Sequence, residues 1–264
     1  MEMNYQEIKV LNETETMRVC IKGSGAPLVY LHPSDGLRWD AFLENLAEEY
    51  TVYAIEFPGT SPGNSYAIHK FFDLNEIVLA YEEVIRKLSL HQIILVGQSF
   101  GGMLAAEIAS YYPNLAKKVV LLDAIGLWDD QFPIPNWNEM KPEEMPNKLF
   151  HNLENDNVKA FFKLPEDLES RVKALALQTW SLGCTGKFVW PIPDCGLAKR
   201  LYRLEAPTLI VWGEKDSLVP VHYAKQFKSL ISNSQVKIIE NAGHIPQVEA
   251  LQETLNTVKQ FLVA

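Results

Sequence analysis

The fold is decided by residues 93–101, which read IILVGQSFG. The first four residues form the short apolar run that is typical of a parallel strand buried on both faces. The last five match Gly-x-Ser-x-Gly, and the residues that follow, up to position 112, show helical spacing. In this setting the serine sits on a sharp strand-to-helix turn that exposes its hydroxyl, and the flanking glycines avoid collisions across the turn. The stretch therefore predicts Ser99 as a nucleophile at the carboxyl end of a sheet.

Strand and helix patterns alternate on both sides of this stretch. Apolar or alternating runs predict the strands, and apolar residues at helical spacing predict the helices between them. The alternation predicts an α/β fold, with a mostly parallel central sheet flanked by helices. The expected strands are residues 16–22, 28–31, 51–55, 93–96, 119–122, 208–212 and 236–239, and the expected helices are residues 39–50, 73–88, 99–112, 221–231 and 248–261.

The alternation breaks between residues 127 and 204, where no buried strand is evident. This stretch is rich in proline and carries four of the six tryptophans, Trp128, Trp137, Trp180 and Trp190. We expect a helical lid inserted over one end of the sheet, with residues 1–126 and 205–264 forming the core domain. Most of the lid's aromatic residues are expected to build its own core, and some to wall an acyl or aromatic pocket.

A serine hydroxyl is a weak nucleophile and needs a base. His244 stands in the segment NAGHIP after the last expected strand, so it belongs at the same end of the sheet as Ser99. The base in turn needs an acid that fixes its tautomer and stabilises the imidazolium. We predict Asp216 for this role. Asp123 and Glu214 also follow expected strands and are the alternatives.

Acyl transfer also requires N–H donors for the oxyanion. The segment HPSDG, residues 32–36, follows an expected strand and precedes a helix. The residue after the nucleophile begins another helix, whose positive end favours developing negative charge. We therefore predict the backbone N–H groups of Ser34 and Phe100 as the two donors.

Together these segments resemble the α/β-hydrolase superfamily, in its lid-bearing, single-domain, esterase-like branch of serine hydrolases. The resemblance covers nearly the whole chain. It rests on the chain order Ser99, Asp216, His244, on WGEKD at residues 212–216 and on GHIPQVE at residues 243–249. It implies the α/β-hydrolase fold, a nucleophile elbow, a Ser-His-Asp triad and an oxyanion hole.

Two segments depart from the family pattern. His32-Pro33 stands where the family usually has His-Gly, and the loop PGTSPGNS, residues 58–65, is two residues longer than the family's Pro-Gly-x-Gly-x-Ser. Proline lacks a backbone N–H. Because the donor implied by the resemblance is one residue later, at Ser34, we expect the oxyanion hole to form in spite of Pro33.

The charge balance and the residue types limit the partners that we expect this protein to bind. Lys and Arg total 24 and Asp and Glu total 33, for a formal net charge of −9. This balance argues against binding to nucleic acid or to an anionic membrane surface. The cysteines, Cys20, Cys184 and Cys195, form no CxxC pair, and the histidines show no metal-ligand spacing. With no apolar signal core and no stretch of about 20 apolar residues, we expect a cytoplasmic protein without a membrane span.

These features combine into one predicted activity. We expect a serine hydrolase that cleaves a small ester or thioester through an acyl-enzyme intermediate, with no cofactor and no metal. Its partner is a small-molecule substrate with an apolar or aromatic part, and the oligomeric state is left open. Two alternatives stand beside it: a carbon–carbon bond hydrolase that uses the same triad, and a hydrolase-derived receptor that binds a small ligand with little turnover.

Overall fold

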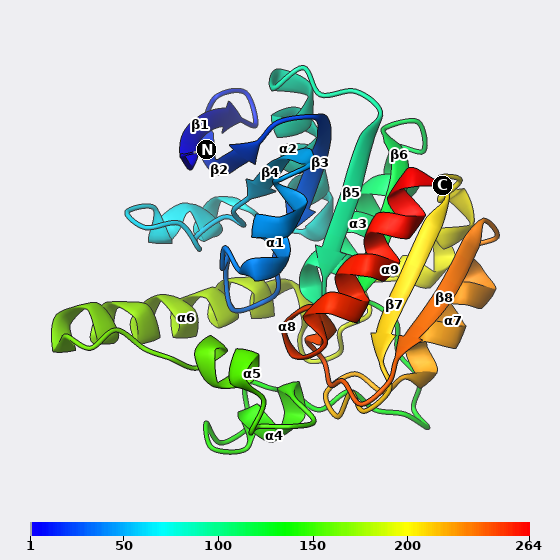
Figure 1. Cartoon of the computed structure of the whole chain (residues 1–264). Coiled ribbons are helices and arrows are strands. Elements are labelled where there is room, and N and C mark those ends of the chain that lie inside the picture. The colour runs from blue at the N-terminus through cyan, green and yellow to red at the C-terminus, as the bar shows by residue number, and fades with distance from the viewer. Residues whose placement is uncertain (1) are drawn as a thin grey trace.

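A central eight-stranded sheet organises the computed structural model, which describes residues 2–264 (Figure 1). The strand order across the sheet is β1-β2-β4-β3-β5-β6-β7-β8. The strands are β1 (Asn4–Val10), β2 (Glu15–Gly23), β3 (Ala26–Leu31), β4 (Tyr50–Ile55), β5 (Ile93–Gln98), β6 (Ala116–Leu122), β7 (Thr208–Gly213) and β8 (Ser234–Ile239).

Six strands of this sheet, β3 to β8, run parallel, while β1 pairs antiparallel with β2 and β2 antiparallel with β4. The predicted mostly parallel α/β sheet is therefore confirmed. The strand β1 was not predicted, because it is largely exposed at the edge and lacks the apolar run of a central strand. Parallel strands bring their carboxyl ends to one edge of the sheet, and the loops after β3, β5, β6, β7 and β8 meet there.

Helices cover both faces of the sheet, and each face has its own apolar core. Apolar residues of α1 and α9 pack on one face, together with Leu28, Val96 and Val211. Those of α2, α3 and α7 pack on the other face, together with Leu95 and Leu121. The helices are α1 (Ala41–Leu46), α2 (Leu74–Lys87), α3 (Phe100–Tyr111), α7 (His222–Leu230), α8 (Pro246–Glu249) and α9 (Leu251–Val263), with the 3-10 turn η1 (Ser65–Lys70).

The chain between β6 and β7 contains helices but no strand. It comprises α4 (Met145–Leu149), α5 (Asp156–Phe161), α6 (Leu168–Val189) and the turns η2 (Leu197–Lys199) and η3 (Leu201–Arg203). The longest helix, α6, projects from the body of the molecule on the left of Figure 1. We refer to residues 127–204 as the insertion. Within residues 2–264, no helix is both long enough and apolar enough to cross a membrane.

Candidate active site

The turn that carries Ser99 is strained and leaves no room for a side chain at Gly97 or Gly101. Ser99 joins β5 to α3 and has φ 54° and ψ −115°, a conformation that non-glycine residues rarely adopt. A Cβ atom on Gly97 would lie 2.1 Å from the carbonyl oxygen of Gly101, and one on Gly101 would lie 2.0 Å from that of Leu31. The turn thus requires glycine at both flanking positions.

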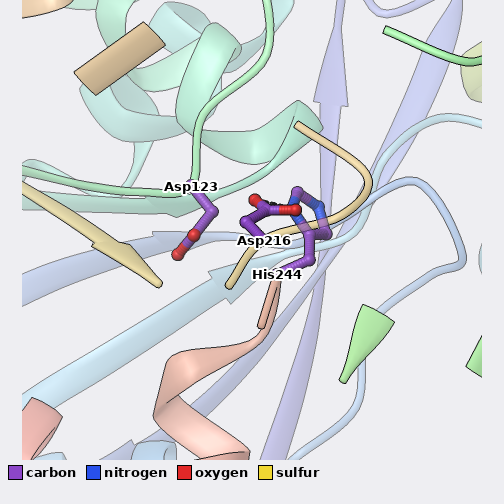
Figure 2. A group of neighbouring side chains, drawn as sticks. All are labelled: Asp123, Asp216 and His244. Atoms are coloured by element: carbon purple, nitrogen blue, oxygen red, sulfur yellow. Dashed lines mark hydrogen bonds and ion pairs between the residues drawn. The ribbon is translucent and has the colours of Figure 1, made fainter. Parts of the chain in front are cut away.

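Three side chains from three loops form one continuous hydrogen-bonded chain. The Nε2 atom of His244 lies 2.9 Å from the Oγ atom of Ser99, and its Nδ1 atom lies 2.7 Å from Oδ2 of Asp216. Figure 2 shows the imidazole of His244 facing the carboxylate of Asp216. Ser99 is 4% exposed and His244 is 2% exposed, so these short contacts form away from bulk water.

Asp216 is held by the turn that follows β7. Its second oxygen, Oδ1, accepts backbone N–H bonds from Leu218 and Val219, both at 2.8 Å. Both carboxylate oxygens of Asp216 therefore accept hydrogen bonds, Oδ1 from the two backbone N–H groups and Oδ2 from the imidazole of His244. These bonds fix the orientation of the carboxylate toward His244.

The alternative acid Asp123 lies beside this chain without joining it. It is fully buried at the end of β6, and its Oδ1 atom accepts the backbone N–H of Gly213 at 2.8 Å, while Oδ2 has no partner within residues 2–264. Burial, followed by the nearby Asp216 carboxylate, raises the pKa of Asp123 well above its usual value. In Figure 2 its carboxyl group points away from His244. The other alternative, Glu214, is exposed and accepts the N–H of Asn241.

Asp123, Asp216 and His244 each place one oxygen or nitrogen atom within 4.8 Å of the others. At this separation the three atoms could ligate one metal ion. Both ring nitrogens of His244, however, are already in hydrogen bonds with Ser99 and Asp216. A metal ion at this cluster would have to break that hydrogen-bonded chain.

The loop after β3 is fixed on two sides. The Nδ1 atom of His32 lies 2.7 Å from the carbonyl oxygen of Pro33, and Nε2 accepts the N–H of Phe57 at 2.9 Å. These two bonds define the neutral tautomer, and burial also lowers the pKa of His32. Ser34 lines the cavity beside Ser99, and the hydroxyl of Thr185 lies 3.2 Å from its carbonyl oxygen.

The two predicted oxyanion donors carry unused N–H groups. Phe100 is the first residue of α3, where no carbonyl of the same helix is available to its N–H. Among the residues that the structure describes, the backbone N–H groups of Ser34 and Phe100 donate to no protein acceptor. Donors left free next to a serine hydroxyl are what an oxyanion hole requires.

A cavity of about 70 Å³ lies above Ser99. Most of its wall is apolar, formed by Trp137, Met145, Leu149 and Leu182 of the insertion and by Leu218 and Ile245 of the core.

The wall also includes two polar side chains outside the hydrogen-bonded chain of Ser99. The Nε2 atom of Gln178 lies 3.4 Å from the Asp35 carboxylate, which also pairs with Arg38 at 3.2 Å. No Lys or Arg of the described chain lines the cavity itself.

Of the four tryptophans in the insertion, only Trp137 lines this cavity within the described residues. Trp180 is 39% exposed and lies against Tyr66, so it is a surface residue. Phe132 and Phe162 are also exposed, at 38% and 40%. These three aromatic residues are therefore exceptions to the prediction that most aromatic residues of the insertion build its core.

One residue that touches the catalytic loops was not predicted. The side chain of Gln98 is fully buried, lines the cavity and donates to the carbonyl oxygen of His244 at 3.2 Å. It occupies the first variable position of the Gly-x-Ser-x-Gly motif, which accepts many residue types, so the sequence carries no signal for this contact beyond its place next to Ser99.

Comparison with known proteins adds a family match. Residues 26–251 match the family model described as the alpha/beta hydrolase fold. Lipase 1 of Psychrobacter immobilis is 29% identical over 177 residues, a match that covers 62% of this chain and 54% of the lipase. The chain thus spans about half the length of the lipases that it matches.

Two further similarities extend over most of the chain. The 2-hydroxy-6-oxononadienedioate/2-hydroxy-6-oxononatrienedioate hydrolase 2 of Pseudomonas putida is 27% identical over 263 residues, which covers 91% of this chain and 89% of that protein. The crystal structure of a membrane phospholipase A, a bacterial virulence factor, has a TM-score of 0.78 at 21% identity and covers 98% of this chain and 86% of that one. At this identity the structural match shows the fold alone.

Proposed function

The chain belongs to the α/β-hydrolase family, and from this premise we propose that it is a serine hydrolase acting on small esters or thioesters. The observation that carries the proposal is the buried chain of hydrogen bonds from Ser99 through His244 to Asp216, with contacts of 2.9 and 2.7 Å. A nucleophile, a base and an orienting acid in this order are the parts that acyl transfer needs.

The reaction begins when Ser99 Oγ attacks the carbonyl carbon of the substrate and passes its proton to Nε2 of His244. Asp216 keeps the Nδ1–H tautomer of His244 and stabilises the imidazolium that forms. His244 then protonates the leaving alcohol or thiol, and the acyl group remains on Ser99. Water, deprotonated by His244, attacks the acyl-enzyme and restores the free serine.

Negative charge develops on the carbonyl oxygen in both steps. Ser34 lines the same cavity as Ser99, and Phe100 follows Ser99 and opens the positive end of α3. We assign the backbone N–H groups of Ser34 and Phe100 to the oxyanion hole. Removing a single donor of this kind typically lowers kcat by about 10²–10³-fold.

The cavity favours a short, largely uncharged acyl group. Its volume is about 70 Å³, and its walls are mostly apolar with Asp35 and Gln178 among the polar lining residues. Because the wall includes Trp137, Leu149 and Leu182, we assign residues 127–204 the role of a lid that shapes the pocket and shields it from water.

Carbon–carbon bond cleavage is the second candidate, because the dienedioate hydrolase of Pseudomonas putida aligns with 91% of this chain. A dioate carries two carboxylates, and burying a charge without a partner is costly. The cavity of the described chain is lined by no Lys or Arg and includes Asp35. We therefore favour the ester or thioester over the dioate.

A substrate panel tests this choice. We expect the purified protein to hydrolyse p-nitrophenyl esters with short acyl chains faster than long ones, and Ser99→Ala to lose that activity. A 2-hydroxy-6-oxo-dienedioate should be turned over poorly. If the dienedioate is cleaved with a higher kcat/KM than every ester, and Ser99→Ala abolishes that cleavage, carbon–carbon hydrolysis replaces ester hydrolysis as the function.

A further inference from the structure

Glu249 joins the loop of His244 to the insertion. Glu249 is 7% exposed, and its carboxylate accepts three backbone N–H groups. Gly243 donates to Oε2 at 2.7 Å, His151 donates to the same oxygen at 3.1 Å, and Asn152 donates to Oε1 at 2.5 Å. One donor precedes the proposed base directly, and the other two belong to the insertion.

Two more hydrogen bonds cross the same junction. The backbone N–H of His244 itself donates to the carbonyl oxygen of Leu149 at 2.8 Å. The side-chain amide of Asn155 donates to the carbonyl oxygen of Glu249 at 2.9 Å. The backbones are also in close contact, because a Cβ atom on Gly243 would lie 2.6 Å from the carbonyl oxygen of Leu149.

The junction lies directly beside the cavity. Leu149, which accepts the N–H of His244, also forms part of the cavity wall, as do His244 and Ile245. The same set of bonds therefore holds the imidazole relative to Ser99 and holds the wall of the insertion relative to the imidazole.

A carboxylate is the side chain that suits this place. Two acceptor oxygens meet three N–H donors, and hydrogen bonds to an ionised acceptor are roughly twice as strong as those between neutral groups. A glutamine amide has one oxygen and one NH₂ group. Whichever way the amide is turned, its NH₂ group would face at least one backbone N–H, so that donor would lose its partner.

We propose that Glu249 is a positioning residue, which holds His244 in reach of Ser99 by clamping the histidine loop to residues 149–152 of the insertion. The proposal rests on the proposed function, because it concerns the base of that reaction. It assigns Glu249 no contact with substrate. Loss of the clamp should lower the rate of the chemical step more than it changes substrate binding.

The test compares two Glu→Gln variants that lie four residues apart. Glu249→Gln alters the junction, whereas Glu253→Gln on α9 removes only a surface ion pair with Lys237, at 2.9 Å, and such pairs contribute little. We measure kcat and KM for a short p-nitrophenyl ester well below the unfolding transition of both variants, together with the rate of phosphonylation of Ser99 by a fluorophosphonate.

We expect Glu249→Gln to lower kcat and the phosphonylation rate by about 10–100-fold with a smaller change in KM, while Glu253→Gln stays within about twofold of the parent. A folded Glu249→Gln protein with lower thermal stability but the parent kcat overturns the proposal, because the role of Glu249 is then only structural. A wild-type protein that hydrolyses its ester through Ser99 in that same experiment leaves the proposed function standing.

Asn155→Asp provides the test if Glu249→Gln does not fold. The Asn155 side chain caps α5 by accepting N–H bonds from Asn157 and Val158, and aspartate is an equally good cap. The change replaces the donor to the carbonyl oxygen of Glu249 by a carboxylate oxygen, which repels that carbonyl and breaks this one bond across the junction. We expect kcat to fall by about two- to fivefold, at most 1 kcal/mol. An unchanged kcat in this variant contradicts the proposal. If wild-type protein shows no Ser99-dependent hydrolysis, both proposals fail together.

Discussion

The two halves of α6 lie in different surroundings although they form one continuous helix. In the outer half, residues 168–180, Leu168 is 73% exposed and Val172 is 56% exposed, and this half projects from the body of the molecule (Figure 1). In the inner half, residues 181–189, Thr185 is fully buried and its hydroxyl lies 3.2 Å from the carbonyl oxygen of Ser34. The inner half of α6 thus contacts the loop of Ser34, and the end of the outer half adds the contact of Gln178 with Asp35.

The different burial of the two halves of α6 predicts where substitutions should alter the protein. Changes at the buried contacts between the insertion, the catalytic loops and the sheet should alter turnover or stability. Changes at exposed positions of the projecting half, such as Leu168 and Val172, should alter neither. The first three comparisons below set a position expected to matter against a matched one expected to matter less, and the last compares one variant at two pH values.

The largest effect is expected at the buried acid. Asp216→Asn should lower kcat by about 10⁴-fold, because the amide favours the wrong tautomer of His244. Asp123→Asn should change kcat by less than about tenfold, since burial already keeps the pKa of Asp123 high and its carboxyl group makes no bond to His244. The measurement is steady-state hydrolysis by folded variants, checked by circular dichroism. The reverse ranking would move the acid to Asp123.

The next comparison sets the two halves of α6 against each other directly. Phe188 is buried in the inner half and packs edge-on against Phe57 with ring centroids 5.8 Å apart. Phe188→Ala should lower the free energy of unfolding by about 3–5 kcal/mol. Leu168→Ala should change it by less than about 0.5 kcal/mol. Urea unfolding measures both, and equal losses at the two positions would show that the outer half is packed in solution.

A smaller effect concerns substrate choice. Trp137→Ala should enlarge the cavity and raise the relative kcat/KM for longer acyl chains by about tenfold, equivalent to about 1.4 kcal/mol. Trp180→Ala, on the outer half, should keep the parental order of chain lengths, because Trp180 does not line the cavity. If both variants keep the parental profile, the insertion does not govern selectivity through these tryptophans.

A further effect, similar in size to the one at Trp137, is expected where the loop after β3 enters α1. Asp40 caps that helix, and its burial, partly offset by backbone hydrogen bonds from Leu43 and Phe42, raises its pKa from 3.8 to about 6. The folded state therefore holds this proton more tightly than the unfolded state. Its contribution to stability is present below about pH 4 and is lost as the pH rises through about 6.

Asp40→Asn keeps a good helix cap and removes this titration. We expect the variant to be more stable than the parent by about 1–2 kcal/mol at pH 7, and to lose that advantage near pH 4. Thermal unfolding at the two pH values measures the difference. An advantage of equal size at both values contradicts the raised pKa.

The central strands and the loops that follow them were predictable because burial leaves a direct mark on sequence. Strands such as β5 and β7 are buried on both faces, and such strands read as apolar runs. Parallel strands place the residues that follow them at one edge of the sheet, and this rule predicts that Ser99, Asp216 and His244 lie together. The edge strand β1 left no such mark, since six of its seven residues are not buried.

Other features depend on contacts between distant segments. Asp123 and Asp216 both follow buried strands, and only the geometry separates the residue that contacts His244 from the one that does not. Apolar residues occur around much of α6, so the sequence does not reveal which end projects. The clamp of Glu249 links positions 97 and 98 residues apart, and its donors are backbone groups that carry no sequence signal.

The measurement that tests the proposed nucleophile most directly is intact-mass analysis after treatment with a fluorophosphonate. We expect the folded protein to gain one phosphonyl adduct, mapped to Ser99 by peptide sequencing, because His244 lies 2.9 Å from its hydroxyl and accepts the proton. Ser99→Ala should gain none. A folded wild-type protein that stays unlabelled, or an adduct that persists in Ser99→Ala, would contradict the assignment of Ser99 as the nucleophile.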